Sequence, residues 1–245
     1  MFKFKQVYDQ LKLVLDPELD QSLVDLGFVQ DINIHQQNVH VSFRLPTYWC
    51  SPNFAYIMGE DIRKRVEELE WVNTTKVNLI DHSESKRVSE GVSEGRSFEE
   101  MFGEMNDGNL NKLRRQFRVK AYNARQERLV KYLLKKEFTK ENIITMKWIV
   151  LNKSLDNNLI DYDLVIRYRD IRNEFNLPIN DDDIAFTDHQ GQRPTLEKFN
   201  DYFLDSRRQR LAMEFNSHFC QGVLQARYDK RENKLYNLLT KKVTN

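Results

Sequence analysis

The chain contains two cysteines, and Cys50 is the one whose surroundings most favour chemistry. It lies in the segment LPTYWCSPN, residues 45–53, between a predicted strand and a predicted helix. Backbone N–H groups at the start of a helix, together with the helix dipole, favour a thiolate over a thiol. Because a thiolate is a good ligand for soft metal ions, we expect Cys50 to bind metal.

The second cysteine, Cys220, lies in a long predicted helix that also carries Glu214 and His218. Glu214 and His218 are four residues apart, so they share a helix face and can coordinate one ion or hydrogen-bond each other. Cys220 follows His218 by two residues, roughly 200° around the helix, so these two cannot bind one ion from a regular helix. In the alternative interpretation, His218 is hydrogen-bonded in the core and Cys220 is a small buried apolar residue. The helical period predicts a core-facing stripe at Leu211, Phe215, Phe219 and Val223.

These residues predict a metal site where the two halves of the chain meet. The predicted ligands are Cys50, His218, Cys220, Glu214 and His82. Thiolate, imidazole and carboxylate ligands together suit iron, with zinc as the alternative, and suit magnesium or calcium poorly. Iron–sulfur clusters prefer thiolate ligands, and this chain has only two cysteines. A cluster bound here would therefore be labile or shared with another protein.

Composition narrows the classes of function. A length of 245 residues suits two domains, and 40% hydrophobic residues are enough for packed cores. With 38 basic and 37 acidic residues the net charge is +1, so no overall field attracts nucleic acid or an acidic membrane. The sequence has no run of about 18 apolar residues and no apolar signal segment, so we expect a cytoplasmic protein with reduced cysteines. Glycine-rich phosphate loops and nucleophile elbows are also missing from the sequence.

The first 82 residues read as a small α/β sandwich. The predicted elements are a helix over 5–15, a hairpin of strands 28–34 and 39–45, a helix over 53–69 and a strand over 76–80. Alternation along the second hairpin strand places Val39, Val41, Phe43 and Leu45 on the core face. The same alternation places His40 on the opposite face, where we expect a surface residue.

The remainder of the chain is predicted to be mainly helical. Residues 83–97 are rich in serine, glutamate and glycine and lack apolar mass, which is typical of a linker. The predicted helices that follow cover 98–105, 110–138, 141–151, 159–175, 196–228 and 230–241. The basic run over 112–120 is interpreted as a solvated helix face. The expected fold class is therefore α+β, with an α/β domain over 1–82, a linker over 83–97 and a helical domain over 98–245.

Two acidic motifs near the N-terminus admit two interpretations. In the simpler one, Asp16-Pro17-Glu18 forms a turn whose side chains cap the following backbone, and Gly27 adopts a conformation that other residues resist. In the sharper one, Asp16 or Glu18 lies beside Cys50 and sets the proton affinity of its sulfur, or guides a partner.

These motifs resemble the PaaD-like and SufT-like domain of iron–sulfur cluster assembly over about residues 5–82. Asp16, Pro17 and Glu18 fit its DPE element, Asp25, Leu26 and Gly27 fit its D-L-G element, and Cys50 falls on its loop cysteine. The family usually has proline directly after the cysteine, whereas Ser51 precedes Pro52 in this chain. The resemblance implies a non-enzymatic accessory factor in iron–sulfur cluster or iron-centre assembly.

By this resemblance, the loop thiolate of Cys50 would bind iron or a transient cluster and deliver it to a client. The implied partners are a client apo-metalloprotein and other cluster-assembly proteins, and the chain could also pair with a second copy as a homodimer. Asp16, Glu18 and Asp25 would be supporting or partner-binding residues. The segment around Glu214, His218 and Cys220 is similar to extended forms associated with di-iron monooxygenase systems, which makes a monooxygenase component a plausible client.

Two other functions fit the same residues. One is a client-binding chaperone without metal, in which Cys50 is structural. The other is a metal-dependent enzyme with Glu214 as general base and a metal, such as zinc, held by His218 and Cys50.

Overall fold

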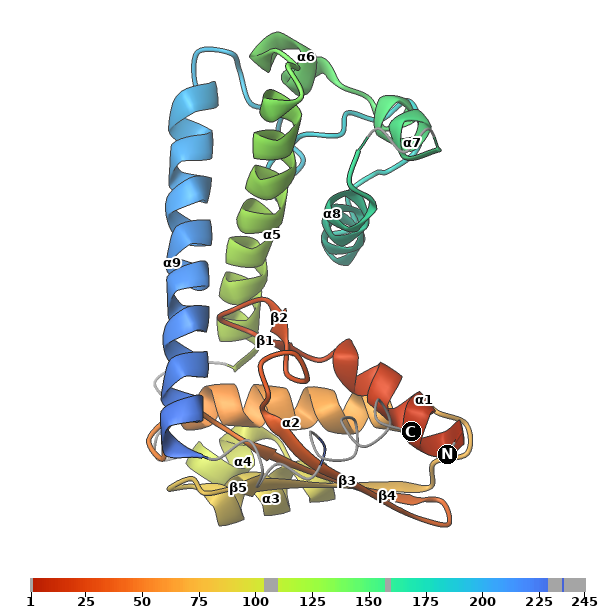
Figure 1. Ribbon diagram of the computed structural model, residues 1–245, viewed down its shortest axis with the longest axis vertical. Coiled ribbons are helices and arrows are strands. Elements are labelled where there is room, and N and C mark those ends of the chain that lie inside the picture. The colour runs from red at the N-terminus through yellow and green to blue at the C-terminus, as the bar shows by residue number, and fades with distance from the viewer. Residues whose placement is uncertain (1, 104–109, 157–159, 229–234, 236–245) are drawn as a thin grey trace. The chain divides into compact units, whose positions relative to one another are not determined.

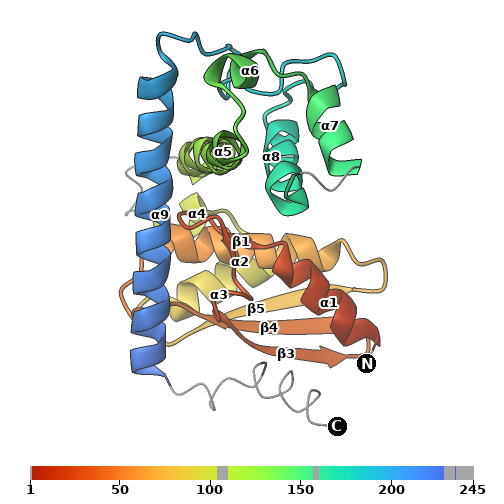
Figure 2. The same cartoon turned by 45° about the horizontal axis from the view of Figure 1, so that its top comes forward.

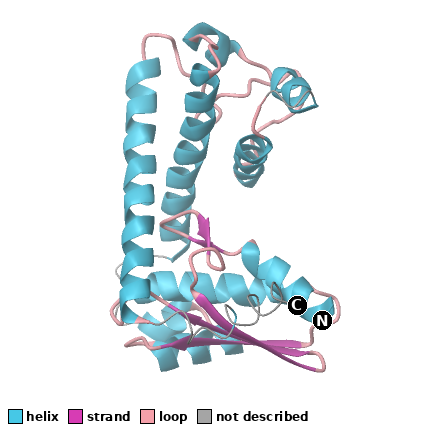
Figure 3. Cartoon of the chain, in the orientation of Figure 1, coloured by secondary structure: helices cyan, strands magenta, loops and turns pink. Residues whose placement is uncertain are grey.

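The computed structural model describes residues 2–103, 110–156, 160–228 and 235 (Figure 1). The fold is α+β, as predicted, and the chain divides into two compact units. Unit 1 comprises Met1–Arg114 together with Phe215–Asn245, and unit 2 comprises Arg115–Glu214. The described strands all belong to unit 1, whereas the described elements of unit 2 are helices (Figure 3).

Unit 1 is built on a three-stranded sheet in the order β3-β4-β5. The predicted hairpin is confirmed as β3 (Val29–His35) and β4 (Asn38–Arg44), which are antiparallel. Strand β5 (Thr74–Ile80) pairs with β4 in parallel, so the chain must cross over between them. Helix α2 (Pro52–Glu67) makes this crossover. A second ribbon pairs β1 (Leu15–Asp16) with β2 (Gln21–Ser22).

The two faces of the sheet differ in burial, as the alternation predicts. Val39, Val41 and Phe43 are fully buried, whereas His40 is exposed on the opposite face. Helices α1 (Phe2–Lys12) and α2 cover the buried face (Figure 2). The loop that carries Cys50 therefore leaves the sheet at the end of β4 and enters the helix packed on it.

The segment predicted to be a linker, residues 83–97, instead contains helix α3 (Ser85–Glu94). Val88 and Val92 are buried in the core of unit 1. The hydroxyl oxygens of Ser89 and Ser93 accept hydrogen bonds from the N–H groups of Leu79 and Val77, at 3.0 Å each. These serines satisfy backbone donors on the outer edge of β5, and an unsatisfied sheet edge would otherwise be open to other chains. The low apolar content of this segment reflects that task.

Close packing in unit 1 depends on Gly91 of α3. A side-chain carbon there would lie 2.5 Å from both Met101 Cγ and Tyr56 Oη. The Tyr56 hydroxyl donates to the carbonyl of Arg96 at 2.8 Å, and its ring meets Phe98 edge-on. Helix α4 (Phe98–Phe102) is thereby held against α2 and α3.

Unit 2 contains most of the predicted helical part. Its elements are α5 (Leu110–Lys135), α6 (Lys140–Thr145), α7 (Trp148–Asp156), α8 (Tyr162–Glu174) and α9 (Phe199–Arg227). The boundaries between the units fall inside α5 and α9, so each of these helices contributes to both. Thr139 is the N-cap of α6, as predicted, but the helix expected over 141–151 is interrupted at Met146 and continues as α7. The helix predicted over 230–241 lies outside the described residues.

A buried polar network fixes the long connection between α8 and α9. Arg172 is completely buried, and its guanidinium donates to the carbonyl of Ala185 and the hydroxyl of Thr187 at 2.9 Å. Gln126 of α5 donates to the carbonyl of Thr187 at 2.6 Å. Because buried polar groups are costly unless paired, this network specifies one path for the connection.

The core stripe predicted for α9 is wrong. Leu211, Phe215 and Phe219 are 47%, 70% and 62% exposed. The inward positions recur every three or four residues and are Phe199, Phe203, Ser206, Arg210, Met213, Ser217, Cys220 and Leu224. Three residues of this inward face, Ser206, Arg210 and Ser217, are polar. The apolar residues alone therefore indicated the opposite face of the helix as the core-facing one. None of the helices described is both apolar enough and long enough to cross a lipid bilayer.

Substitution of Gly91 by alanine tests the close contact of α3. We expect Gly91→Ala to lower the free energy of unfolding by about 1–3 kcal/mol, because the added methyl overpacks the site. Gly222→Ala in α9 is the control, since a side-chain carbon there meets nothing within 4 Å and alanine favours helix. Urea unfolding followed by circular dichroism measures both. Equal effects of the two substitutions would contradict the packing argument.

Candidate functional site

The Cys50 loop is fixed by contacts with Thr47 before the cysteine and by the start of α2 after it. Its N–H donates to the carbonyl of Thr47 at 3.4 Å, and the Thr47 hydroxyl lies 3.2 Å from the sulfur. Ser51 is the N-cap of α2 and Pro52 is its first residue. The Cys50 side chain is half-buried against the core of unit 1, so its sulfur is neither sealed inside nor fully exposed.

His82 fixes the other side of this loop. Its Nδ1 accepts a hydrogen bond from the N–H of Glu84 at 3.1 Å. The ring proton must then lie on Nε2, which donates to the carbonyl of Cys50 at 2.7 Å. The side chain is 3% exposed. The imidazole that was predicted to be a metal ligand thus has both nitrogens engaged and positions the Cys50 backbone.

Asp16 forms the turn of the simpler interpretation. Its Oδ1 accepts hydrogen bonds from the N–H groups of Glu18 and Leu19 at 2.9 Å each. Burial raises the pKa of Asp16 from 3.8 to about 6, and these two hydrogen bonds oppose the shift. Gly27 has φ +76°, the left-handed conformation expected of it. The turn therefore places a carboxyl that titrates near neutral pH under the surface of unit 1.

The last part of α9 belongs to unit 1 and brings Cys220 to this region. Asn216 donates to the Glu18 carboxylate at 3.3 Å, and the Ser217 hydroxyl donates to Gln21 at 2.8 Å. Leu224 lies over Gly27, where a side-chain carbon would be 3.6 Å from it. Cys220, like Cys50, packs half-buried against the core of unit 1.

Burial and nearby negative charge act in the same direction on Cys220. Burial first, and then the charges of Asp16, Cys50 and Glu18 in that order, together raise the pKa of the Cys220 thiol from 9.0 to about 11. Both thiols therefore pack against the core of unit 1, on the same side of it as the DPE motif whose charges act on Cys220. At neutral pH Cys220 is therefore mainly a thiol, and a nearby positive charge or metal ion would favour loss of its proton.

The end of α9 is anchored beside the Cys50 loop. Arg227 donates to the carbonyl of Pro46 at 2.8 Å and reaches the carboxylate of Asp81 at 3.5 Å. The Tyr228 hydroxyl also bonds to Asp81, and the Arg44 guanidinium stacks over the Tyr228 ring at 3.8 Å. The two strand ends that flank the site, those of β4 and β5, are thus tied to the same helix.

The other predicted residues lie elsewhere. Glu214 belongs to unit 2, where its carboxylate pairs with Arg210 at 2.6 Å and Arg128 at 3.4 Å. Although burial raises the pKa of Glu214, the arginines lower it below its usual value overall. His218 and Asp25 are exposed side chains. Within the described ranges, no three His, Cys, Asp or Glu side chains gather closely enough to hold a metal ion.

Sequence reasoning missed several residues at this site. Trp49 is 78% exposed and meets Tyr48 edge-on, so a large aromatic surface stands directly before Cys50. Thr47 and Arg227 were also unassigned. The aromatic pair could have been found from its position, because Tyr48 and Trp49 follow the last alternating residue of the hairpin and precede the helix. No pattern in the sequence near Arg227 predicts its contacts with Pro46 and Asp81.

Part of the chain is similar in sequence to known proteins. Residues 5–79 match the family of iron–sulfur cluster assembly proteins. The chain is also 30% identical over 92 residues to the uncharacterized protein MJ1129 of Methanocaldococcus jannaschii, which spans 94% of that protein and 37% of this chain. The chain belongs to the iron–sulfur cluster assembly protein family. The predicted resemblance is thereby confirmed.

A second relative of this family carries a descriptive name. The chain is 27% identical over 77 residues to the Fe-S protein maturation auxiliary factor YitW of Bacillus subtilis, which covers 74% of that protein and 31% of this chain. No solved structure matches the chain. The family match runs from α1 to β5 and includes Cys50, whereas Cys220 lies outside it.

The buried carboxyl of Asp16 predicts a pH-dependent effect of its substitution. The folded-state pKa is raised, so the cost of the buried charge develops as pH rises from about 4 to about 6 and is complete above that. Asp16→Asn keeps an oxygen for the two N–H groups and removes the charge. We expect the variant to gain up to about 3 kcal/mol relative to wild type at about pH 8, and little at about pH 4, in urea unfolding. A larger relative gain at pH 4 would contradict this.

The raised pKa of Cys220 predicts slow alkylation. We expect its reaction with iodoacetamide to accelerate about tenfold per pH unit above pH 8, with no plateau before about pH 11, because only the thiolate reacts. Peptide mass spectrometry separates Cys220 from Cys50. The double variant Asp16→Asn/Glu18→Gln should react faster at pH 8, whereas the exposed Asp25→Asn should not. A plateau near pH 9 in wild type would contradict the geometry.

Proposed function

We propose that this chain is an accessory factor in the maturation of iron–sulfur or iron centres, with Cys50 and Cys220 as the paired thiols that receive the metal cargo. The family match supports the class of function. The single observation that carries the finer proposal is that the last part of α9, held by Asn216 and Ser217, packs Cys220 against the same core of unit 1 as Cys50. Cargo here means iron or a transient cluster that passes through the protein.

The donor set fits such a cargo. Two sulfur ligands suit iron and iron–sulfur clusters. Thr47 can donate a hydrogen bond to the Cys50 sulfur, which stabilises a thiolate. A cation that arrives at the site would offset the negative charges that raise the pKa of Cys220 and would favour release of its proton.

The small number of ligands favours transfer over permanent binding. Clusters are commonly held by four thiolates, and this site offers two. The remaining ligands would come from sulfide, solvent or a partner. We infer that the cargo is bound jointly with a donor or client protein and leaves when the client supplies more ligands.

The surroundings of Cys50 suit a protein partner. Trp49 is the most exposed large apolar side chain in the structure's described part, at 78%. Tryptophan and tyrosine dominate the energetics of many protein interfaces. We infer that Trp49 and Tyr48 contact the client apo-protein. A component of a di-iron monooxygenase is one client of this class, on the basis of the sequence around residues 207–220.

The enzyme alternative has less support. Glu214 would need to accept a proton, but the arginines at its carboxylate lower its pKa. A carboxylate held by two guanidinium groups is a weak base. The role that fits Glu214 is structural, in unit 2.

Removal of each thiol tests the proposed function. After anaerobic loading with iron and sulfide, we expect Cys50→Ala to lower the affinity for iron by at least about tenfold and Cys220→Ala to lower it less, because each loses one sulfur ligand. Iron and sulfide analysis and visible absorption measure the loss. His40→Ala, on the open sheet face, is the control and should bind as wild type does.

An iron-transfer assay distinguishes a defect in cargo binding from a defect in client contact. We expect Trp49→Ala to load iron normally but to deliver it more slowly to an apo-ferredoxin acceptor. Unchanged iron binding in Cys50→Ala would contradict the cargo role. Wild type that binds an apo-protein but no iron would favour the metal-free chaperone instead.

A further inference from the structure

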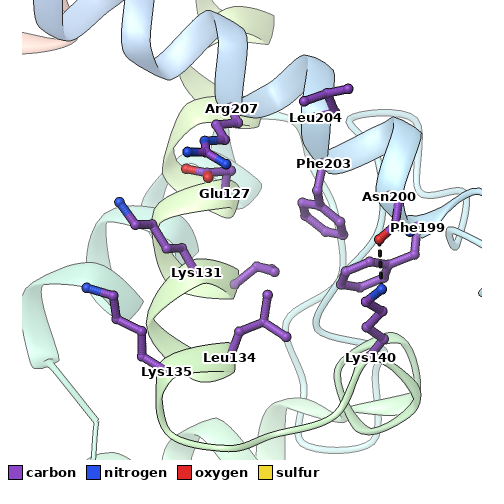
Figure 4. A pocket seen from close by; sticks show the side chains of 11 residues that line it. Glu127, Lys131, Leu134, Lys135, Lys140, Phe199, Asn200, Phe203, Leu204 and Arg207 are labelled. Carbon is purple, nitrogen blue, oxygen red and sulfur yellow. Dashed lines mark hydrogen bonds between the residues drawn. The ribbon is translucent and has the colours of Figure 1, made fainter.

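Unit 2 contains a half-open pocket of about 450 Å³ between α5 and the start of α9 (Figure 4). Phe199 and Phe203 extend from the α9 side and are 3% and 8% exposed, so they form an apolar floor. Leu134 and Leu204 are 41% and 45% exposed and form the walls. Pockets that bind ligands commonly have volumes of about 300–1,000 Å³ and an apolar lining.

Three cations line the opening, and we call Lys131, Lys135 and Arg207 the cationic rim. All three side chains are exposed. In the part of the chain that the structure describes, none of them forms an ion pair with a carboxylate. Lys140 also lines the pocket, but its ammonium group donates to Asn200 at 2.8 Å. The rim thus carries three positive charges that are free to meet a ligand.

The acidic residue of the lining does not neutralise this rim. Glu127 pairs with Arg210, and both side chains are at least nine-tenths buried. Arg210 also donates to Glu214 at 2.6 Å. The negative charge of Glu127 is therefore already satisfied inside unit 2. The local excess of positive charge contrasts with the net charge of +1 for the whole chain.

The arrangement of the charges indicates the kind of ligand. Lys131 and Lys135 lie one helical turn apart, about 6 Å along α5, so they suit separate carboxylates better than one small anion. The floor suits a large apolar side chain. Among the described lining residues, none presents a buried polar atom without a partner that would orient a small molecule.

We propose that this pocket docks an acidic segment of a partner protein, with a large apolar side chain on the phenylalanine floor and flanking carboxylates on the cationic rim. The proposal does not depend on the metal-cargo function of unit 1. Nucleic acid fits less well, because the aromatic rings of the floor are too buried to offer faces for base stacking.

Peptides of defined composition test the docking site with the full-length chain. The probes are blocked, fluorescent 12-residue peptides of glutamate that carry leucine or phenylalanine at different spacings, with matched glutamine peptides. We expect at least one acidic peptide to raise its anisotropy on binding, and its glutamine counterpart to bind at least about tenfold more weakly. Added salt should weaken the acidic peptide's binding.

Substitutions inside and outside the pocket lining test whether the peptide binds at the pocket. Lys131→Glu/Lys135→Glu and Leu204→Asp should each weaken the acidic peptide by at least about tenfold, through loss of charge complementarity and of the apolar wall. Arg193→Glu/Lys198→Glu makes the same change in charge at exposed residues of unit 2 outside the lining and should leave binding unchanged. Circular dichroism confirms that each variant is folded.

Three outcomes would overturn the proposal. The first is that wild type binds none of the peptides. The second is that the control pair loses as much affinity as the rim pair. The third is that phosphatidylglycerol vesicles, a single-stranded oligonucleotide or octanoate compete more strongly than every peptide and lose affinity in the rim variant.

Discussion

The docking of the last part of α9 onto unit 1 is the constraint on which the candidate site depends. Asn216 reaches Glu18 in the turn between β1 and β2, Ser217 reaches Gln21 of β2, and Arg227 reaches the carbonyl of Pro46 before the Cys50 loop. These contacts hold Cys220 against the same core as Cys50. The family match contains Cys50 alone, so the helical extension adds the second thiol to this core.

Burial and hydrogen bonding act in opposite directions on the pKa of Asp16. The N–H groups of Glu18 and Leu19 favour the charged form of Asp16, but burial outweighs them and raises its pKa to about 6. Near that pH a small change in environment decides whether the carboxyl is ionised. An arriving cation would favour ionisation of both Asp16 and Cys220, so proton release and cargo binding would be coupled.

The sequence contained enough information for the sheet and too little for the long-range contacts. The hairpin of β3 and β4 was predictable because its alternation is local and one face is buried. Helix α3 was missed because Ser89 and Ser93 resemble linker residues until the edge of β5 is seen to need their hydroxyls. The inward face of α9 was missed because Ser206, Arg210 and Ser217 interrupt its apolar pattern. Cys50 and Cys220 were assigned to one site from their ligand chemistry alone, because no local periodicity encodes a contact between residues so far apart in the chain.

Unit 2 uses buried polar groups to fix the surface around its pocket. Tyr202, between the two phenylalanines of the floor, donates its hydroxyl to Gln126 of α5 at 2.8 Å. Gln126 in turn donates to the carbonyl of Thr187, which also accepts from Tyr122. The first turns of α9 are therefore tied directly to α5, and α5 is tied to the connection that Arg172 holds in place. A pocket whose floor is fixed in this way loses little conformational entropy on binding, and that favours recognition of a flexible acidic segment, which must itself become ordered.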